Sequence, residues 1–451
     1  MKHFKPLLLL VAAPLILGGC NMFNKKNKEP ETNDNQDNEE DKTPSKRDKV
    51  NVNIRAKINT ENEAGYDVKI DFKDDDFDGS ATTFSDKIKM LSLGACASSE
   101  NEAKAKAFYE EMYYDNITYH LPETTADSIG YIIAHRSFEN YDVVSLVIRS
   151  IEYKEEWSNN FQIGESGDHV GFKNRADEVY SALNNYLETY KDKEVKLWVS
   201  GYSRGGGIAN VLASKIMTGG ADENKTFVYT FEAPRGLALE NAIEYKNVFN
   251  LVNNVDIVAM IPPEQYGLYR CGIDIVINSA EKNIDELLYD FDNKIELPEF
   301  VPTANYETEQ EFSNFLITSL LEDTNNPETT LNTRAAYYAN YQDNISYFMG
   351  LYFSLPQSTI DKIKNGFNNL GMLEKLTLFV GDGLYNFIKP YLNADNIPYD
   401  DAMLKSACSS LVKLLSAKSS LLSSLQNEDF LGNLRRIISQ HALEAVYVLI
   451  K

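Results

Sequence analysis

The sequence predicts an α/β fold with a central, mostly parallel sheet, flanking helices and an inserted helical cap. Three observations carry that prediction. Residues 195–217 run from a short stretch of β-forming residues through a glycine-rich turn into an amphipathic helical pattern. Residues 226–231 and 248–255 are further short apolar runs that predict strands. Residues 283–430 then follow helical spacing with prolines between the segments, which predicts a helical cap.

The other elements follow in chain order. Strict alternation of apolar and polar residues in 50–58 and 66–72 predicts a hairpin with one buried face. Periodicity then predicts helices at 84–112 and 174–190, and short apolar runs predict strands at 129–135 and 143–149.

The turn after residues 195–200 reads Gly201-Tyr202-Ser203-Arg204-Gly205, a G-x-S-x-G pattern. In a nucleophile elbow, a serine occupies a strained turn between strand and helix, and residues without a Cβ let the two approach closely. The helix that follows points its first N–H groups toward a developing oxyanion. The pattern alone is common, and a glycine-rich turn that binds phosphate is the alternative. The strand before it and the helix after it favour a nucleophile at Ser203.

Chain order then restricts the partners that such a serine needs. A hydrolase built on this elbow places serine, acid and histidine in that order along the chain. Of the five histidines, only His441 follows Ser203. Asp256, just past the predicted strand 248–255, is the preferred acid, because open α/β sheets place functional groups at the carboxyl ends of strands. Glu232, after strand 226–231, is the alternative.

Several blocks together resemble the class 3 (fungal-type) lipase family of α/β-hydrolases, in the order expected for that family. They are V-V-S-L-V-I-R-S at 143–150 with Trp157, His169-Val170-Gly171-Phe172, Y-T-F-E-A-P-R at 229–235, and Asp256-Ile257-Val258 with Pro262-Pro263. The resemblance covers roughly residues 130–272 and the tail around His441. It implies the α/β-hydrolase fold, ester hydrolysis without a cofactor, and a lipid or other ester substrate.

The same resemblance implies two oxyanion donors, the main-chain N–H groups of Arg204 and Ile151. The sequence departs from the family at this point, since Ser150 and Ile151 stand where a glycine and then a serine or threonine are expected. The hydroxyl donor is therefore either absent or supplied by Ser150. Glu232 replaces a family glycine and adds a carboxyl group near the predicted site.

The first residues have the pattern of a secretory signal, with Lys2 and Lys5, an apolar run at 7–17, and Gly18-Gly19-Cys20. A cysteine directly after the cleavage position resembles a bacterial lipoprotein signal, which implies lipid attachment at Cys20 and anchoring on the extracytoplasmic face of the cell membrane.

Composition narrows the class of partner and of site. The chain holds 44 basic and 67 acidic residues, for a net charge of −23, which argues against nucleic acid as a partner. Beyond Cys20 there are three widely spaced cysteines, which form neither a disulfide framework nor a metal pattern. No metal site is predicted, and His120, His135 and His169 are interpreted as structural, with His169 near the site.

Together these features predict a membrane-anchored extracytoplasmic serine hydrolase, a lipase or esterase and possibly a phospholipase, with Ser203, Asp256 and His441 as its triad. A surface binding or adhesion lipoprotein on a degenerate hydrolase scaffold is the alternative. Acyl chain length, head group and oligomeric state are not set by the sequence. The predicted domains are a signal at 1–19, a polar tether at 20–49, the core at 50–282, the cap at 283–430 and a C-terminal core segment at 431–451.

Overall fold

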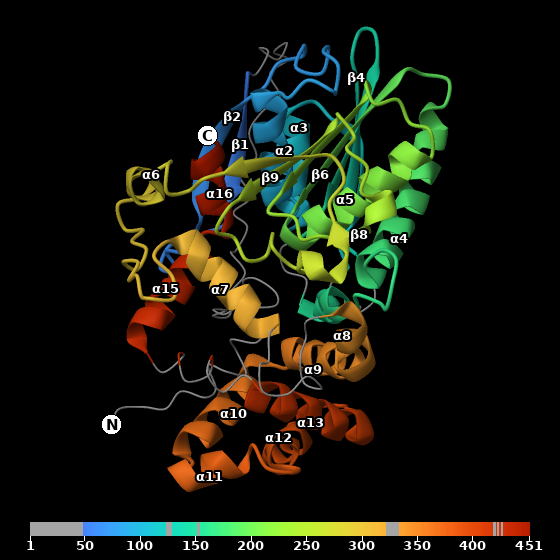
Figure 1. The fold of residues 1–451 in the computed structure, drawn as a ribbon. Coiled ribbons are helices and arrows are strands. Elements are labelled where there is room, and N and C mark those ends of the chain that lie inside the picture. Colours follow the sequence, from blue (N-terminus) through green and yellow to red (C-terminus); the bar gives the residue numbers. More distant parts are fainter. Residues whose placement is uncertain are drawn as a thin grey trace, which may run out of the picture.

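The computed structural model describes residues 48–122, 129–150, 154–321, 333–417, 421, 424 and 427–451. Figure 1 shows a central sheet covered by helices, with a group of further helices below it.

The central sheet has seven strands, and its order is β11-β9-β7-β6-β5-β4-β3. The five strands from β5 to β11 run parallel, whereas β4 and β3 run antiparallel to their neighbours at one edge. The strands are β3 (Asp115–His120), β4 (Tyr131–Ser137), β5 (Asp142–Ile148), β6 (Val195–Tyr202), β7 (Thr226–Phe231), β9 (Val248–Asn253) and β11 (Ile273–Ile277). The predicted α/β fold with a mostly parallel sheet is therefore confirmed. The two edge strands, β3 and β11, were not predicted, because edge strands are partly exposed and their apolar runs are short.

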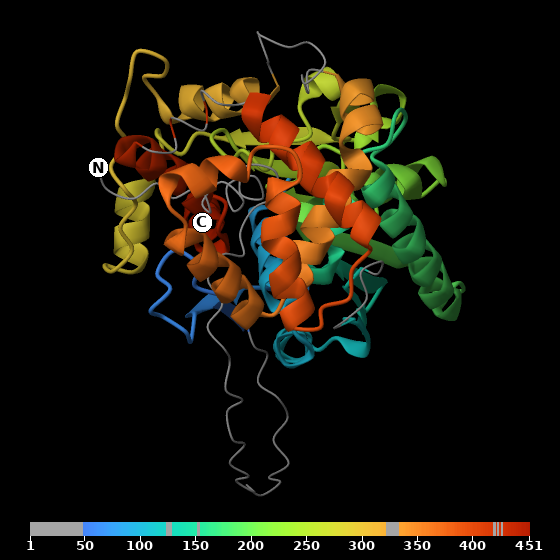
Figure 2. The same ribbon diagram turned by 90° about the horizontal axis from the view of Figure 1, so that it is seen from below.

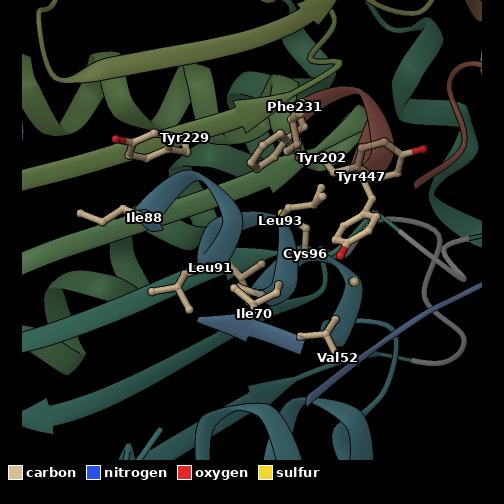
Figure 3. Packing of buried hydrophobic residues seen from close by; sticks show 14 of the residues in the cluster. Val52, Ile70, Ile88, Leu91, Leu93, Cys96, Tyr202, Tyr229, Phe231 and Tyr447 are labelled. Carbon is tan, nitrogen blue, oxygen red and sulfur yellow. The ribbon is translucent and has the colours of Figure 1, made fainter. Parts of the chain in front are cut away.

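Both faces of the sheet are covered, and alternate strand residues point to opposite faces. On one face, α4 (Val170–Leu187) and α5 (Ser203–Thr218) pack against residues such as Val144 and Val199. On the other face, α2 (Asp86–Ser98), α3 (Glu102–Glu111) and the C-terminal helix α16 (Leu443–Ile450) pack against residues such as Trp198. Figure 3 shows this second core, where Leu93 and Cys96 of α2 lie near Tyr202 of β6 and Tyr447 of α16.

The predicted hairpin forms a separate two-stranded antiparallel sheet of β1 (Lys49–Ile54) and β2 (Tyr66–Asp71). The helical pattern predicted over 84–112 forms two helices. The first, α2, ends at Ser98, and Asn101 begins α3 by accepting a hydrogen bond from the Lys104 N–H. A capping side chain therefore divides an apolar pattern that periodicity alone joined.

Small elements complete the loops near the sheet. β8 (Leu237–Ala238) and β10 (Leu268–Tyr269) form an antiparallel pair. The described part of the chain also contains the short 3₁₀ helices η1 (Lys154–Phe161), η2 (Glu188–Tyr190), η3 (Leu239–Asn241) and η4 (Glu264–Tyr266).

A series of helices lies between β11 and α16 in the sequence. It comprises α6 (Ile284–Phe291), α7 (Glu309–Leu321), α8 (Arg334–Asn340), α9 (Gln342–Ser354), α10 (Gln357–Asn369), α11 (Met372–Thr377), α12 (Gly383–Ala394), α13 (Asp401–Ala417) and α15 (Glu428–Ser439). In Figure 1, α6, α7 and α15 lie nearer to the sheet, whereas α10 to α13 lie farther below it. Figure 2 shows the molecule from below, with the orange and red helices of this second group in front. Among the described residues, no helix combines the length and apolar character needed to cross a membrane.

Candidate active site

Ser203 lies at the junction of β6 and α5, where the predicted elbow is found. Its φ of 54° is in the left-handed region, which a serine rarely adopts and which stores backbone strain. A Cβ at Gly201 would lie 2.4 Å from the Gly205 carbonyl oxygen, and a Cβ at Gly205 would lie 2.6 Å from that of Ile148. Both glycines are therefore required for steric reasons, as the motif predicts.

The structure brings Ser203, His441 and Asp256 into one hydrogen-bonded array. The Ser203 Oγ and the His441 Nε2 are 2.8 Å apart, and the His441 Nδ1 and the Asp256 Oδ2 are 2.5 Å apart. The three residues are 5%, 2% and 0% exposed, respectively. A serine hydroxyl that is hydrogen-bonded to an imidazole, with the imidazole oriented by a carboxylate, is the arrangement that activates an oxygen nucleophile.

The C-terminal segment carries His441 to this position across the whole helical insertion. His441 follows α15, and the next helix, α16, is buried against the sheet. Gln440 fixes the turn, because the Asn253 side chain of β9 donates to its Oε1 at 3.1 Å and its own amide donates to Glu309 of α7. Arg436, one turn earlier, binds Glu309 and Asp285.

Tyr202 holds the histidine from the other side. Its ring stacks on the His441 imidazole with centroids 5.2 Å apart, and its hydroxyl donates to the His441 carbonyl oxygen. This role was not predicted from the sequence, although Tyr202 stands directly before Ser203 in the motif. The roles of Gln440 and Arg436 were not predicted either; their position, one and five residues before the only histidine after Ser203, was the available signal.

The acid that contacts His441 is Asp256 and not Glu232. The Asp256 carboxylate also accepts a hydrogen bond of 2.9 Å from the Val258 N–H, so one oxygen is held by the main chain and the other by the imidazole. Glu232 is equally buried, and its carboxyl group lies within hydrogen-bond reach of Asp256. Burial and the neighbouring Asp256 raise the pKa of the Glu232 carboxyl well above its usual range.

Of the two predicted oxyanion donors, the structure describes Arg204. Arg204 is the second residue of α5, so its N–H belongs to the first turn, whose amides have no acceptor within the helix. Ile151 lies outside the described residues. The Ser150 hydroxyl is buried without a hydrogen-bond partner in the described part of the chain, and a Cβ at Gly205 would lie 3.1 Å from it. An uncommitted hydroxyl therefore lies beside the elbow.

The other histidines have structural contacts. His169 caps α4 by accepting from the Phe172 N–H, and burial lowers its pKa to about 3, so it is neutral. His135 lies between Asp115 and Asp142, at 2.7 Å from each. Asp142 pairs with Val195 at the start of β6, whereas Ser203 follows the end of β6. His135 therefore lies near the opposite ends of the strands from Ser203. His120 is partly exposed, at 3.7 Å from Glu178.

The three cysteines among the described residues are buried and free. Cys96, Cys271 and Cys408 form no disulfide, as their spacing predicts. Cys20, the predicted lipidation site, lies outside the described residues.

Residues 136–266 match the family model described as lipase (class 3). The matched segment contains Ser203 and both acid candidates and ends before His441. Three similar solved structures have little sequence in common with this chain. The Rhizomucor miehei lipase propeptide complex is 18% identical with a TM-score of 0.33, over 44% of this chain and 71% of that one. A lipase from Rhizopus microsporus var. chinensis is 16% identical with a TM-score of 0.32, over 43% and 76% of the two chains. Lipase II from Rhizopus niveus is 15% identical with a TM-score of 0.32, over 43% and 82%.

No curated protein matches the chain. The family-model match, together with the sheet, the elbow and the array of Ser203, His441 and Asp256, supports a lipase-type ester hydrolase on an α/β-hydrolase fold.

Proposed function

We propose that the protein is a serine hydrolase that cleaves carboxylic esters of lipids, with Ser203 as nucleophile, His441 as base and Asp256 as the acid. The hydrogen-bonded array from the Ser203 Oγ through the imidazole to the Asp256 carboxylate carries this proposal. The reaction that such an array performs is acyl transfer to water, and it requires no cofactor.

The first half of the proposed reaction forms an acyl-enzyme. The His441 Nε2 accepts the Ser203 proton while the Ser203 Oγ attacks the ester carbonyl carbon, and the carbonyl oxygen becomes an oxyanion. The N–H of Arg204, at the start of α5, stabilises that charge, and the proposed second donor is the N–H of Ile151 or the Ser150 hydroxyl. The protonated imidazole then gives its proton to the leaving alcohol, and the carbon–oxygen bond breaks.

Water completes the cycle by the same route. The imidazole removes a proton from water, the hydroxyl attacks the acyl-enzyme carbonyl, and the proton returns to the Ser203 Oγ as the carboxylic acid leaves. The Asp256 carboxylate accepts a hydrogen bond from the His441 Nδ1–H throughout, so the Nε2 lone pair faces Ser203. Lipid esters are proposed as substrates because residues 136–266 match the lipase (class 3) model.

Labelling with a fluorophosphonate probe tests the proposed nucleophile. The wild-type protein is expected to be labelled and to hydrolyse a short-chain ester, and Ser203→Ala is expected to lose both. Ser181→Ala, which changes an exposed serine of α4, is the matched control and keeps both. An unlabelled, folded wild-type protein would favour the second candidate, a binding or adhesion lipoprotein on a hydrolase scaffold.

We also propose that the protein is held at the extracytoplasmic face of the cell membrane by lipid attached to Cys20. The apolar run followed by Gly18-Gly19-Cys20 supports this. Cell fractionation of Cys20→Ser is the test. The proposal predicts that the variant leaves the membrane fraction, and retention of the processed variant at the parental level would contradict it.

A further inference from the structure

Glu232 is a buried acid in a backbone conformation that does not suit it. It follows β7 directly, it is 1% exposed, and its φ of 48° is in the left-handed region, which glycine adopts far more readily than glutamate. Burying a carboxyl group without a compensating partner costs several kcal/mol. Such a residue is therefore kept only where its surroundings hold the carboxyl group firmly.

The contacts of Glu232 are directed at the catalytic acid. The Asn253 N–H, at the end of β9, donates to both carboxyl oxygens, at 3.1 and 3.0 Å. The carboxyl group of Glu232 also lies within hydrogen-bond reach of Asp256, which follows Asn253 by three residues. Since Asp256 already accepts from the Val258 N–H and contacts the His441 Nδ1, Glu232 supplies a third contact to the same carboxylate.

The charges around this pair decide which group holds a proton. The neighbouring ionisable groups are Asp256 after β9, Arg270 between β10 and β11, and His441 after α15. Glu309 of α7 does not contact the pair directly. It accepts a hydrogen bond from the side chain of Gln440, the residue before His441. Arg270 is shared, because its guanidinium also binds Asp274 and the carbonyl oxygens of Ala233 and Ala259.

Two buried carboxyl groups in hydrogen-bond contact cannot both be ionised easily. Burial and Asp256 raise the pKa of Glu232, so Glu232 is the member of the pair that keeps its proton. A neutral carboxyl group can donate a hydrogen bond to a carboxylate, which an ionised one cannot do.

We propose that Glu232 is a positioning residue of the hydrolase: its protonated carboxyl group donates a hydrogen bond to the Asp256 carboxylate and holds it against His441. This inference rests on the proposed function and adds a residue to the same site. Glu232 does not act as the triad acid, because the imidazole contacts Asp256. Its effect on Ser203 passes through Asp256 and His441.

The arrangement has a direct consequence for pH dependence. Glu232 is neutral at low pH, and as the pH rises through its raised pKa it gains a second buried negative charge beside Asp256. The stability that the neutral form contributes is therefore fully present below the ordinary pKa of a glutamate and is lost as the pH rises from there through the raised pKa. Turnover falls over the same range, because the donor to Asp256 is lost.

Two substitutions separate the proton from the side chain. In Glu232→Gln the amide keeps a donor toward Asp256 and an acceptor for the Asn253 N–H, but it has no titratable proton. Turnover is expected to stay within about threefold of the wild type at neutral pH, and the decline in both turnover and thermal stability with rising pH is expected to disappear. Glu232→Gly suits the backbone and removes the donor, and we expect kcat to fall about tenfold with KM unchanged. Glu264→Gln, which changes an exposed carboxylate, is the control.

The outcomes distinguish this inference from the proposed function. A folded wild-type protein with neither ester hydrolysis nor probe labelling would reject the proposed function and the inference with it. If the wild type is active and both Glu232 variants keep its kcat and its pH profile, the inference alone is rejected. A loss in Glu232→Gln as large as that in Asp256→Asn would also overturn it, because Glu232 would then be the acid itself.

Discussion

The surroundings of His441 and the helices α9 to α13 are held together by different forces. Around His441, buried polar groups bind one another, with the Tyr202 hydroxyl, Gln440 and Arg436 each in a specific hydrogen bond or ion pair. The helices α9 to α13 fall within the predicted cap at 283–430 and are called the cap below. Their apolar side chains, from α9, α12 and α13, pack on Phe161 and Ile163.

The cap also leaves some apolar surface uncovered. A small hollow of about 30 Å³ lies between α9, α10, α12 and α13, lined by apolar residues and Lys364. Leu373 of α11 and Val380 just after it are 78% and 71% exposed. Apolar contacts are non-directional and tolerate exchange, whereas a buried hydrogen bond fixes one geometry. Single polar contacts therefore set the geometry around His441, whereas the cap depends on the sum of many apolar contacts.

Replacing the base should have the largest effect. His441→Ala is expected to lower kcat about 10⁶-fold, because a triad works as a unit and the serine loses its proton acceptor. The measurement is hydrolysis of a short-chain ester by protein whose circular dichroism is unchanged. His120→Ala, at a partly exposed histidine, is the matched control. A folded His441→Ala variant with near wild-type turnover would refute the triad.

Changing the acid should cost less. Asp256→Asn is expected to lower kcat about 10⁴-fold, because the amide no longer fixes the histidine tautomer. Steady-state kinetics on the same ester provide the measurement. Glu232→Gln serves as the comparison and should lose far less, and the reverse ranking would make Glu232 the acid.

In the cap, the expected effect is on stability. Leu392 of α12 is fully buried and lines the hollow, so Leu392→Ala should lower the free energy of unfolding by about 2–5 kcal/mol. Leu373→Ala, at an exposed site, should change it by less than about 0.5 kcal/mol. Thermal and chemical unfolding measure both. Equal effects at the two positions would contradict the packing described for the cap.

Removing one hydroxyl at the site should have the smallest effect. Tyr202→Phe keeps the ring stacked on His441 but leaves its carbonyl oxygen without the tyrosine donor. We expect kcat to fall about fivefold with KM unchanged, since one hydrogen bond is worth about 1 kcal/mol. An unchanged kcat would mean that stacking alone holds the imidazole.

The inner strands, the elbow at Ser203 and the choice of His441 could be predicted from the sequence, because each depends on a local pattern or on chain order. Short apolar runs predicted the inner strands, and the spacing of glycines around Ser203 predicted the strained elbow, because its steric requirement lies within five residues. Chain order alone selected His441, since no other histidine follows Ser203.

The triad acid and the contacts around His441 could not be predicted from the sequence, because they depend on segments that are distant in the chain and meet only in the fold. The choice between Asp256 and Glu232 required the position of an imidazole 185 residues beyond Asp256 in the chain. The same holds for the contacts from Tyr202 and Gln440 to the His441 turn, and for the hydrogen bond that joins Glu232 to Asp256. Periodicity reports which face of an element is buried, but a buried polar contact depends on which two elements the fold brings together.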